Sequence, residues 1–348
     1  MSDDCELILG DALDVLPTLV PRSVQCIVTS PPYFGLRDYG VTPTDWPTIA
    51  YCVVPMPGLP VMTIPAQSVC LGLETTPEAY VGHLVHVFRL ARKVLADDGV
   101  VFLNLGDSYA NDTKWGGQSG GKHALGVHGN SGIGRGRRTT GLPAKNLMGI
   151  PWRVAFALQA DGWILRNDVI WHKPAAMPES VKDRFTKDHE YVFFFSKNER
   201  YYFDQKAVRE RATPHGIAQQ KRGRSLTHKN INGAPGQVAQ TLNAARPSDP
   251  DRIIPEYRNR RTVWRIGIRG SKELHYAPMP EALVEPCILA GSRVGDTVLD
   301  MFGGTGTVAR VALRHNRRAT SIDINPDYVE IQQRRTNAVQ RVLLEAMV

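Results

Sequence analysis

A glycine-rich turn between a predicted strand and a predicted helix is the first feature of this sequence that could do chemistry. The turn contains Asp300, Phe302, Gly303, Gly304, Thr305, Gly306 and Thr307, and the next predicted strand ends at Asp323. Glycines allow a ligand close to the backbone, and an acid at the tip of the next strand suits bonding to ribose hydroxyls. The pattern is neither G-x-G-x-x-G nor a P-loop, so it favours a different nucleoside cofactor. A turn whose glycines serve packing alone also fits.

The second such feature is the run Ser30-Pro31-Pro32-Tyr33, which directly follows a predicted strand. Two prolines remove two N–H donors, so the chain leaves the sheet here and nearby carbonyls are free. The Ser30 hydroxyl or a carbonyl such as that of Pro31 could accept hydrogen bonds from an exocyclic amine and return electron density to its nitrogen. Tyr33 could stack on an extruded base. Taken alone, the run also fits an ordinary turn with a surface tyrosine.

The surrounding elements place both features in an alternating α/β pattern. Strands are predicted in the runs CELILGD, VQCIVTS, VVFLNLGDS, WILRNDVIWH, HEYVFFFSK and RRATSIDIN and at the start of GDTVLDMFGG, with amphipathic helices between several of them. Residues 40–70 are rich in proline and predict an irregular, flexible insertion. Residues 112–141 contain ten glycines and predict a second flexible insertion, which could close over DNA or serve no such purpose. The order of elements predicts a mostly parallel sheet with helices on both faces.

Positive charge is concentrated in one segment of the 348-residue chain. The net charge is +8, and residues 204–265 alone contain thirteen Lys and Arg against five Asp and Glu. Such a segment is typical of a phosphate-binding surface, although a solvated basic loop would have the same composition. The candidate DNA-binding residues in it are Lys221, Arg222, Arg224, Arg258, Arg260 and Arg261.

The two motifs together resemble the amino-methylating DNA methyltransferases of the permuted β group, the N4-cytosine and N6-adenine family. In that group the catalytic motif comes first, the target-recognition region follows, and the cofactor motif comes last. The resemblance implies an α/β, Rossmann-like, seven-stranded S-adenosylmethionine-dependent methyltransferase sheet with an inserted basic target-recognition region. It implies a catalytic half over 1–203, a recognition region over 204–265 and a cofactor-binding half over 266–348.

The family pattern also implies roles for matching residues. Ser30, Pro31, Pro32 and Tyr33 correspond to the catalytic motif, and the cofactor S-adenosylmethionine would contact Asp300, Phe302, Gly303, Gly304, Thr305, Gly306, Thr307 and Asp323. His275 and Pro280 lie in a stretch that resembles the contact with the methionine end. Asp11 resembles an acid near the adenine, and it equally fits a helix N-cap. Trp171 would line the base pocket, or else serve as a buried anchor.

A serine at the first motif position favours N4-cytosine as the target, with N6-adenine as the alternative. A hydroxyl can donate to cytosine N3 or accept from the amine, whereas a carboxylate only accepts. A catalytically inactive DNA-binding relative would be expected to have lost one of the two motifs, and both are intact. Carbon-5 methylation is excluded because no cysteine follows a proline at the catalytic turn.

The remaining expectations concern partners and surroundings. The five cysteines are scattered without metal-ligand spacing, which predicts reduced thiols and no metal site. No apolar run is long enough to span a bilayer, and the acidic N-terminus lacks the features of a secretion signal. We therefore expect a cytoplasmic protein, monomeric or homodimeric, that acts on double-stranded DNA beside a possible cognate restriction endonuclease.

Overall fold

The computed structural model describes residues 4–35, 40–110, 140–176, 178–214, 217, 256–268 and 279–345, the last six without their side chains. The chain divides into two compact units. One contains Met1–Asp204 and Thr262–Val348, and the other is Gln205–Arg261. Most of residues 112–141 lie outside the described residues.

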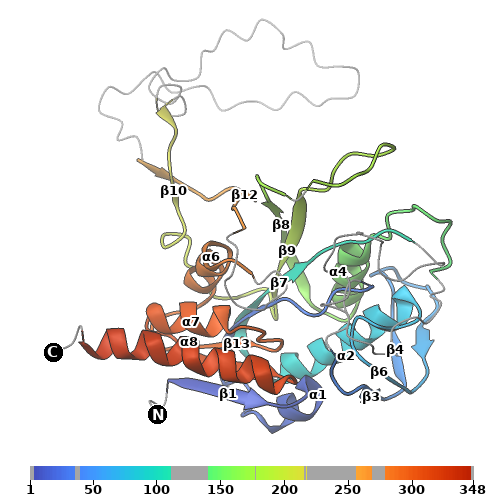
Figure 1. Cartoon of the computed structure of the whole chain (residues 1–348), viewed down its shortest axis with the longest axis horizontal. Helices are drawn as coiled ribbons and strands as arrows, with labels where there is room; N and C mark the ends of the chain where they lie inside the picture. The colour runs from blue at the N-terminus through green and yellow to red at the C-terminus, as the bar shows by residue number, and fades with distance from the viewer. Residues whose placement is uncertain are drawn as a thin grey trace, which may run out of the picture. The chain divides into compact units, whose positions relative to one another are not determined.

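An eight-stranded sheet forms the framework of the larger unit (Figure 1). Its strands, in spatial order, are β1 (Cys5–Leu9), β14 (Arg318–Asp323), β13 (Thr297–Asp300), β2 (Val24–Thr29), β7 (Leu95–Leu105), β9 (His189–Ser196), β8 (Ile164–His172) and β12 (Val263–Arg265). Only β9 runs antiparallel to its neighbours. The predicted α/β, mostly parallel sheet is confirmed, with one strand more than the expected seven. The additional edge strand is β12, which pairs with β8. Its residues lie within the basic segment 204–265, where no strand of the sheet was expected.

Helices cover the sheet. Contacts join α1 (Ala12–Val15), α2 (Pro77–Val94) and α4 (Ile150–Ala160) in one group, and α6 (Glu281–Gly291), α7 (Thr307–Arg314) and α8 (Pro326–Glu345) in another. Five of the six residues of β2 are buried, as expected for a parallel strand covered on both faces. No helix within the described ranges is long and apolar enough to cross a membrane.

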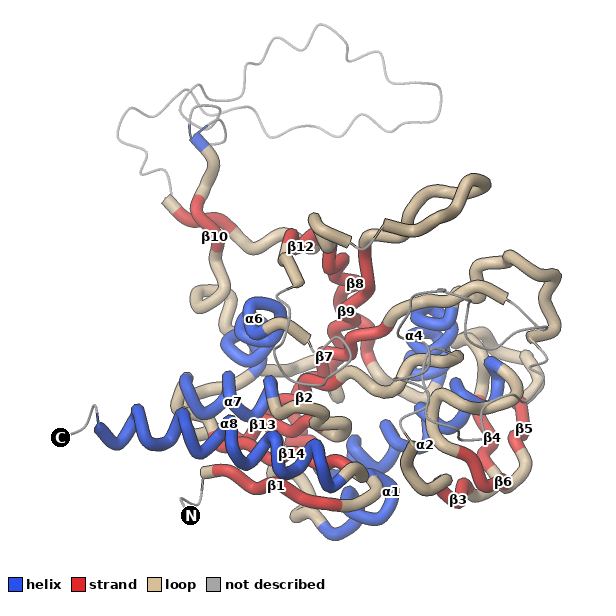
Figure 2. The backbone as a smooth tube through the Cα atoms, in the orientation of Figure 1, coloured by secondary structure: helices blue, strands red, loops and turns tan. Residues whose placement is uncertain are grey.

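Residues 40–70 differ from the irregular, flexible insertion that their prolines predict. They form two short antiparallel ladders, β3 (Thr44–Trp46) with β6 (Gln67–Val69) and β4 (Ile49–Tyr51) with β5 (Met62–Ile64). Figure 2 shows β4 and β5 beside α2, and contacts confirm it. Trp46, Tyr51 and Ile64 belong to the buried core. Alternating buried side chains therefore override the irregularity that prolines impose on a short segment.

A buried carboxylate–imidazole contact connects α2 to the turn after β2. Glu74 and His83 have no exposed side-chain surface, and their Oε1 and Nδ1 atoms lie 2.8 Å apart. The other carboxylate oxygen of Glu74 accepts from the Gly72 amide at 2.8 Å. The Gly72 carbonyl in turn accepts from the Gly35 amide at 2.9 Å. This chain of contacts fixes the loop that contains the Ser30-Pro31-Pro32-Tyr33 run.

Candidate active site

A cavity of about 260 Å³ lies where the parallel strands end, and both sequence motifs line it. Its walls include Asp300, Phe302, Gly303, Gly304, Thr305, Thr307 and Asp323 from the first motif, and Ser30, Pro31, Pro32 and Tyr33 from the second. Because β13 and β2 are adjacent and parallel, their carboxyl ends meet at one edge of the sheet. The fold thereby brings together residues from the two ends of the chain.

A direct hydrogen bond joins the two motifs. The Thr29 hydroxyl at the end of β2 donates to Asp300 Oδ1 at the end of β13, over 2.7 Å. The same oxygen accepts from the Phe302 amide at 3.1 Å. Both Thr29 and Asp300 are buried. Burial raises the pKa of Asp300 to about 7, against the opposing effect of these two hydrogen bonds.

The glycine turn has no space for side chains at its centre. A Cβ atom on Gly303 would lie 2.1 Å from Ser321 Oγ and 2.7 Å from Gln332 Nε2. Gly306 has φ +73° and a Cβ there would also meet Gln332, at 2.9 Å. Gly306 itself is not part of the cavity wall, so its role is to bend the chain into α7. Glycine is therefore required here by packing and by backbone conformation.

Asp323 is oriented by backbone donors at the tip of β14. Its Oδ2 accepts from the Gly304 amide at 2.7 Å, and its Oδ1 accepts from the Asn325 amide at 2.8 Å. Burial raises its pKa to about 6. Each carboxylate oxygen has a further lone pair for a ligand hydroxyl. Two oriented acceptor oxygens in the cavity wall fit the ribose hydroxyls of a nucleoside cofactor.

The proline turn after β2 is held from outside the cavity. Tyr80 on α2 donates from its hydroxyl to the Pro32 carbonyl at 2.9 Å. Gly72, with φ +91°, passes so close that a Cβ would lie 3.0 Å from the Tyr33 carbonyl. The Tyr33 ring lies against Gly106, where a Cβ would approach Cε2 to 2.6 Å. These contacts position Ser30, Pro31 and the Tyr33 ring at the cavity wall.

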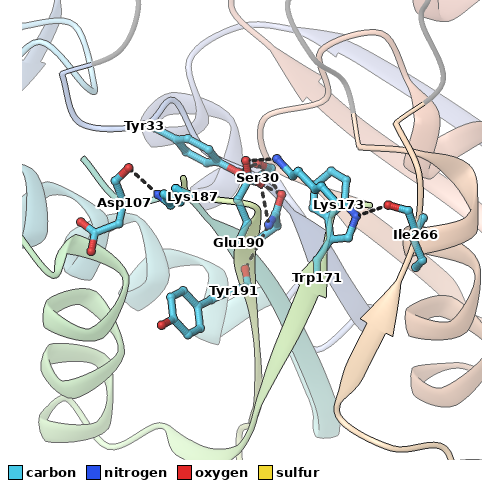
Figure 3. Close-up of polar contacts among 10 residues, drawn as sticks. Ser30, Tyr33, Asp107, Trp171, Lys173, Lys187, Glu190, Tyr191 and Ile266 are labelled. Atoms are coloured by element: carbon cyan, nitrogen blue, oxygen red, sulfur yellow. Dashed lines mark hydrogen bonds and ion pairs between the residues drawn. The ribbon is translucent and has the colours of Figure 1, made fainter. Parts of the chain in front are cut away.

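A polar network surrounds the hydroxyl groups of this turn (Figure 3). The Tyr33 hydroxyl lies 3.0 Å from both Asn104 Oδ1 and Glu190 Oε2. Ser30 Oγ lies 3.3 Å from the Tyr33 hydroxyl and 3.4 Å from Asn104 Oδ1. Burial, reinforced by the Glu190 charge, raises the pKa of Tyr33 well above its ordinary value. The phenol therefore keeps its proton and remains a donor.

The carboxyl end of β8 supplies a cation and an aromatic ring to the same cavity. Lys173 forms an ion pair with Glu190 Oε1, and its ammonium lies 4.2 Å from the centre of the Trp171 ring. Trp171 is buried and donates from Nε1 to the Ile266 carbonyl at 2.9 Å. It is thus a buried anchor that also lines the cavity, and a contact with the target base stays a prediction.

Three further predicted contacts have different outcomes. Asp11 caps α1 through the Leu13 amide at 2.8 Å and also lines the cavity, so the N-cap is confirmed and a place near the adenine stays a prediction. Pro280 is the N-cap residue of α6, and the preceding Met279 lines the cavity in its place. His275 lies outside the described residues.

The predicted DNA-binding arginines are placed only in part. Arg258 and Arg261 in the smaller unit both approach Glu210 Oε1, at 2.9 and 3.1 Å. Arg260 is half-buried on the same segment. Lys221, Arg222 and Arg224 lie outside the part of the chain that the structure describes.

Sequence reasoning assigned no role to four polar residues of the site: Thr29, Asn104, Lys173 and Glu190. Asn104 carries the clearest signal, because a lone amide stands inside the apolar run VVFLNL and buried amides need partners. Lys173 directly follows β8 and Glu190 is the second residue of β9, and nothing in their spacing indicates that they pair. Only the antiparallel arrangement of β8 and β9 brings them together.

Comparison with known proteins agrees with this geometry. The family model N6_N4_Mtase, described as DNA methylase, matches residues 24–334. Type II methyltransferase M.Cfr9I of Citrobacter freundii is 38% identical over 325 residues, which cover 92% of this chain and 84% of that protein. Type II methyltransferase M.SmaI of Serratia marcescens is 35% identical over 331 residues, covering 95% and 90%.

Solved structures show a similar fold. PvuII DNA methyltransferase (cytosine-N4-specific) superimposes with a TM-score of 0.57 and 18% identity, over 98% of this chain and 92% of that one. A putative DNA modification methylase of Thermus thermophilus, in complex with S-adenosyl-L-methionine, gives a TM-score of 0.51 and 21% identity, over 96% and 93%. At this identity the likeness concerns the fold alone.

Replacing Thr29 with Val should destabilise the protein and raise the pKa of Asp300 further. Valine keeps the volume but removes the donor, and losing a partner of a buried acceptor costs about 1–3 kcal/mol. Chemical denaturation measures the loss of unfolding free energy. Thr297→Val, at the opposite end of β13, is the matched control and should cost less. Equal losses in the two variants would show that the Thr29 hydrogen bond has no special weight.

The raised pKa of Asp300 should make the ligand-free protein less stable as pH rises. Its folded-state pKa of about 7 exceeds the ordinary 3.8, so its contribution is complete below 3.8 and is lost as pH rises through about 7. Asp300→Asn is neutral at every pH and should lose less stability between about pH 6 and about pH 8. Melting temperatures at the two pH values test this. Identical pH dependence in both proteins would contradict the assignment.

Proposed function

The chain belongs to the N6_N4_Mtase family of DNA methylases, and from that premise we propose that it transfers a methyl group to the N4 amine of cytosine in double-stranded DNA. The observation that carries this proposal is the Ser30 hydroxyl in the wall of the same cavity as the cofactor turn. The family is S-adenosylmethionine-dependent, and that cofactor supplies the electrophilic methyl group. The chain's own residues must orient the two reactants and exclude water.

We propose that the glycine turn and the acids beside it bind the cofactor. Asp323, with both oxygens oriented by backbone amides, accepts hydrogen bonds from the ribose hydroxyls. Asp11 lies near the adenine, and Phe302 lines the same part of the cavity. Asp300 supports the turn through the Phe302 amide and holds the proline turn beside it through Thr29. His275 and Pro280 are the proposed contacts of the methionine end.

The proline turn is the proposed catalytic element. The exocyclic amine of cytosine is a weak nucleophile, because its lone pair is delocalised into the ring. Hydrogen bonds from its N–H groups to Ser30 Oγ and the Pro31 carbonyl return electron density to the nitrogen. The Tyr33 ring, fixed by its hydroxyl and by Gly106, offers a stacking surface to a base that has left the duplex. The proton lost after transfer leaves from the methylated amine.

The smaller unit and the basic residues around it are the proposed DNA-recognition region. Phosphate contacts there would come from Lys221, Arg222, Arg224, Arg258, Arg260 and Arg261. The relatives M.Cfr9I and M.SmaI are type II methyltransferases, which supports a role in restriction–modification beside a cognate endonuclease. A single copy of the chain contains both motifs, so a monomer is sufficient for the chemistry.

The target base can be determined directly. DNA from cells that express the protein and lack other amino-methyltransferases should contain N4-methyldeoxycytidine, quantified by mass spectrometry of the nucleosides. DNA from cells expressing Ser30→Ala is the control and should contain far less. N6-methyldeoxyadenosine in place of the cytosine product would refute the proposed base and leave the family assignment intact.

Neutralising Arg222 and Arg224 together should make DNA binding less sensitive to salt. Each lost phosphate contact lowers the slope of log affinity against log salt by about 0.9. Titrations of a labelled duplex at several salt concentrations measure that slope. The matched control replaces Arg22 and Arg293, which pair with Asp97 and Asp98 in the larger unit, and removes the same charge. An equal change in slope in both double variants would place the DNA contacts elsewhere.

A further inference from the structure

Three donors of the polar network beside the proline turn, from Lys173, Tyr33 and Asn104, reach one acceptor, Glu190 (Figure 3). Its Oε1 pairs with the Lys173 ammonium. Its Oε2 accepts from the Tyr33 hydroxyl at 3.0 Å and from Asn104 Nδ2 at 3.4 Å. A carboxylate only accepts, and an ammonium only donates. The ion pair therefore gives this end of the network a fixed polarity.

Glu190 and a backbone carbonyl together determine which way the Asn104 amide points. Its Nδ2 faces two groups that can only accept, Glu190 Oε2 and the Tyr191 carbonyl, the latter at 3.0 Å. Its Oδ1 is thereby turned to the Ser30 and Tyr33 hydroxyls. Asn104 is 2% exposed, so solvent cannot compensate a reversed amide. The orientation follows from the partners.

The consequence reaches the Ser30 hydroxyl. The hydrogen of Ser30 has acceptors inside the network, at Asn104 Oδ1 and at the Tyr33 oxygen. Tyr33 keeps its own proton and has Glu190 as an acceptor, so it is free to accept from Ser30. With its hydrogen used inside the protein, Ser30 presents oxygen lone pairs to the cavity.

We propose that Glu190, held by Lys173, is a positioning residue that makes Ser30 a hydrogen-bond acceptor for the substrate amine. This inference rests on the proposed role of Ser30. It explains why the Ser30 hydroxyl, which can also donate, acts only as an acceptor toward the substrate amine. Glu190 acts through Asn104 and Tyr33, so its effect is on the transfer rate.

A purely stabilising ion pair explains the arrangement less well. The side chains of Lys173 and Glu190 are 14% and 16% exposed. At such burial the desolvation cost of two charges offsets much of their attraction, so a buried pair is weak evidence for a stabilising role. A single apolar or neutral pair would fill the same space. In the wild-type protein, a carboxylate opposite an ammonium cannot exchange donor and acceptor roles, so the pair gives the network one direction.

Two glutamine variants can separate the effect of hydrogen-bond direction from the effect of the charges on Glu190 and Lys173. In Glu190→Gln, Lys173 still only donates and takes the glutamine oxygen, which turns the new NH₂ group toward Asn104 and Tyr33. The Tyr33 hydroxyl must then accept from that NH₂ group and turn its own hydrogen to Asn104 Oδ1, while Asn104 Nδ2 keeps the Tyr191 carbonyl. Both acceptors of the Ser30 hydrogen are then partly occupied. In the double variant Glu190→Gln/Lys173→Gln, Gln at 173 accepts from Gln at 190, so the oxygen at 190 again faces Asn104 and Tyr33. The double variant restores the direction without restoring either charge.

The experiment measures single-turnover methyl transfer from labelled S-adenosylmethionine to unmethylated DNA, with cofactor and DNA both saturating. Glu190→Gln should slow transfer at least about tenfold, equivalent to about 1.4 kcal/mol in the barrier. The double variant should recover most of that rate, and Lys173→Gln, which keeps the carboxylate acceptor, should be faster than Glu190→Gln. Dissociation constants for cofactor and DNA, and melting temperatures, should differ little among the variants.

Three results would overturn the proposal. They are wild-type transfer by Glu190→Gln, a loss explained by weaker binding of cofactor or DNA, and a folded double variant as slow as the single one. The last would assign the effect to charge or to proton acceptance by Glu190. If Glu190→Gln alone does not fold, a folded double variant far slower than Lys173→Gln overturns the proposal equally. Failure of the proposed target base would appear separately, in the nucleoside produced by the wild-type protein.

Discussion

The rest of the site depends on one buried hydrogen bond, which joins Thr29 and Asp300. It joins the ends of two adjacent parallel strands, and each strand is followed by one of the two chemical motifs. Parallel strands must end at the same edge, so loops separated by most of the chain are held together by backbone pairing. Neither motif can shift without breaking this buried contact. An in-line transfer between two bound molecules needs that kind of fixed geometry.

The arrangement has an electrostatic cost, because it buries two carboxylic acids. Asp300 and Asp323 lie in one cavity wall, and burial raises the pKa of both, to about 7 and about 6. Backbone amides and the Thr29 hydroxyl offset part of this cost. Acids that are pre-oriented and incompletely solvated can gain more from ligand hydroxyls than exposed acids would. The same principle applies on the catalytic side, where Glu190 is paired with Lys173.

Much of this architecture was predictable from the sequence, and the reasons are local. Strand periodicity, the double proline and the glycine turn predicted the α/β sheet and the resemblance to the family, which the fold and the comparisons confirm. The insertion at 40–70 was predicted wrongly, because its ladders are short and its order comes from packing against α2. Asn104, Lys173 and Glu190 could not be assembled from spacing, since strand pairing alone brings them together. The roles of the individual site residues remain predictions, as does the division of the chain into catalytic, recognition and cofactor segments.

The central claim is that the proline turn and the glycine turn form one active site, in which the first acts in methyl transfer and the second binds the cofactor. The most direct measurement compares Ser30→Ala with the wild-type protein in cofactor binding by calorimetry and in single-turnover transfer of labelled methyl to DNA. We predict an unchanged dissociation constant for S-adenosylmethionine and transfer slowed by about a hundredfold, the usual scale for loss of one hydrogen bond to a reacting group. Unchanged transfer, or equal loss of cofactor binding, would contradict the claim.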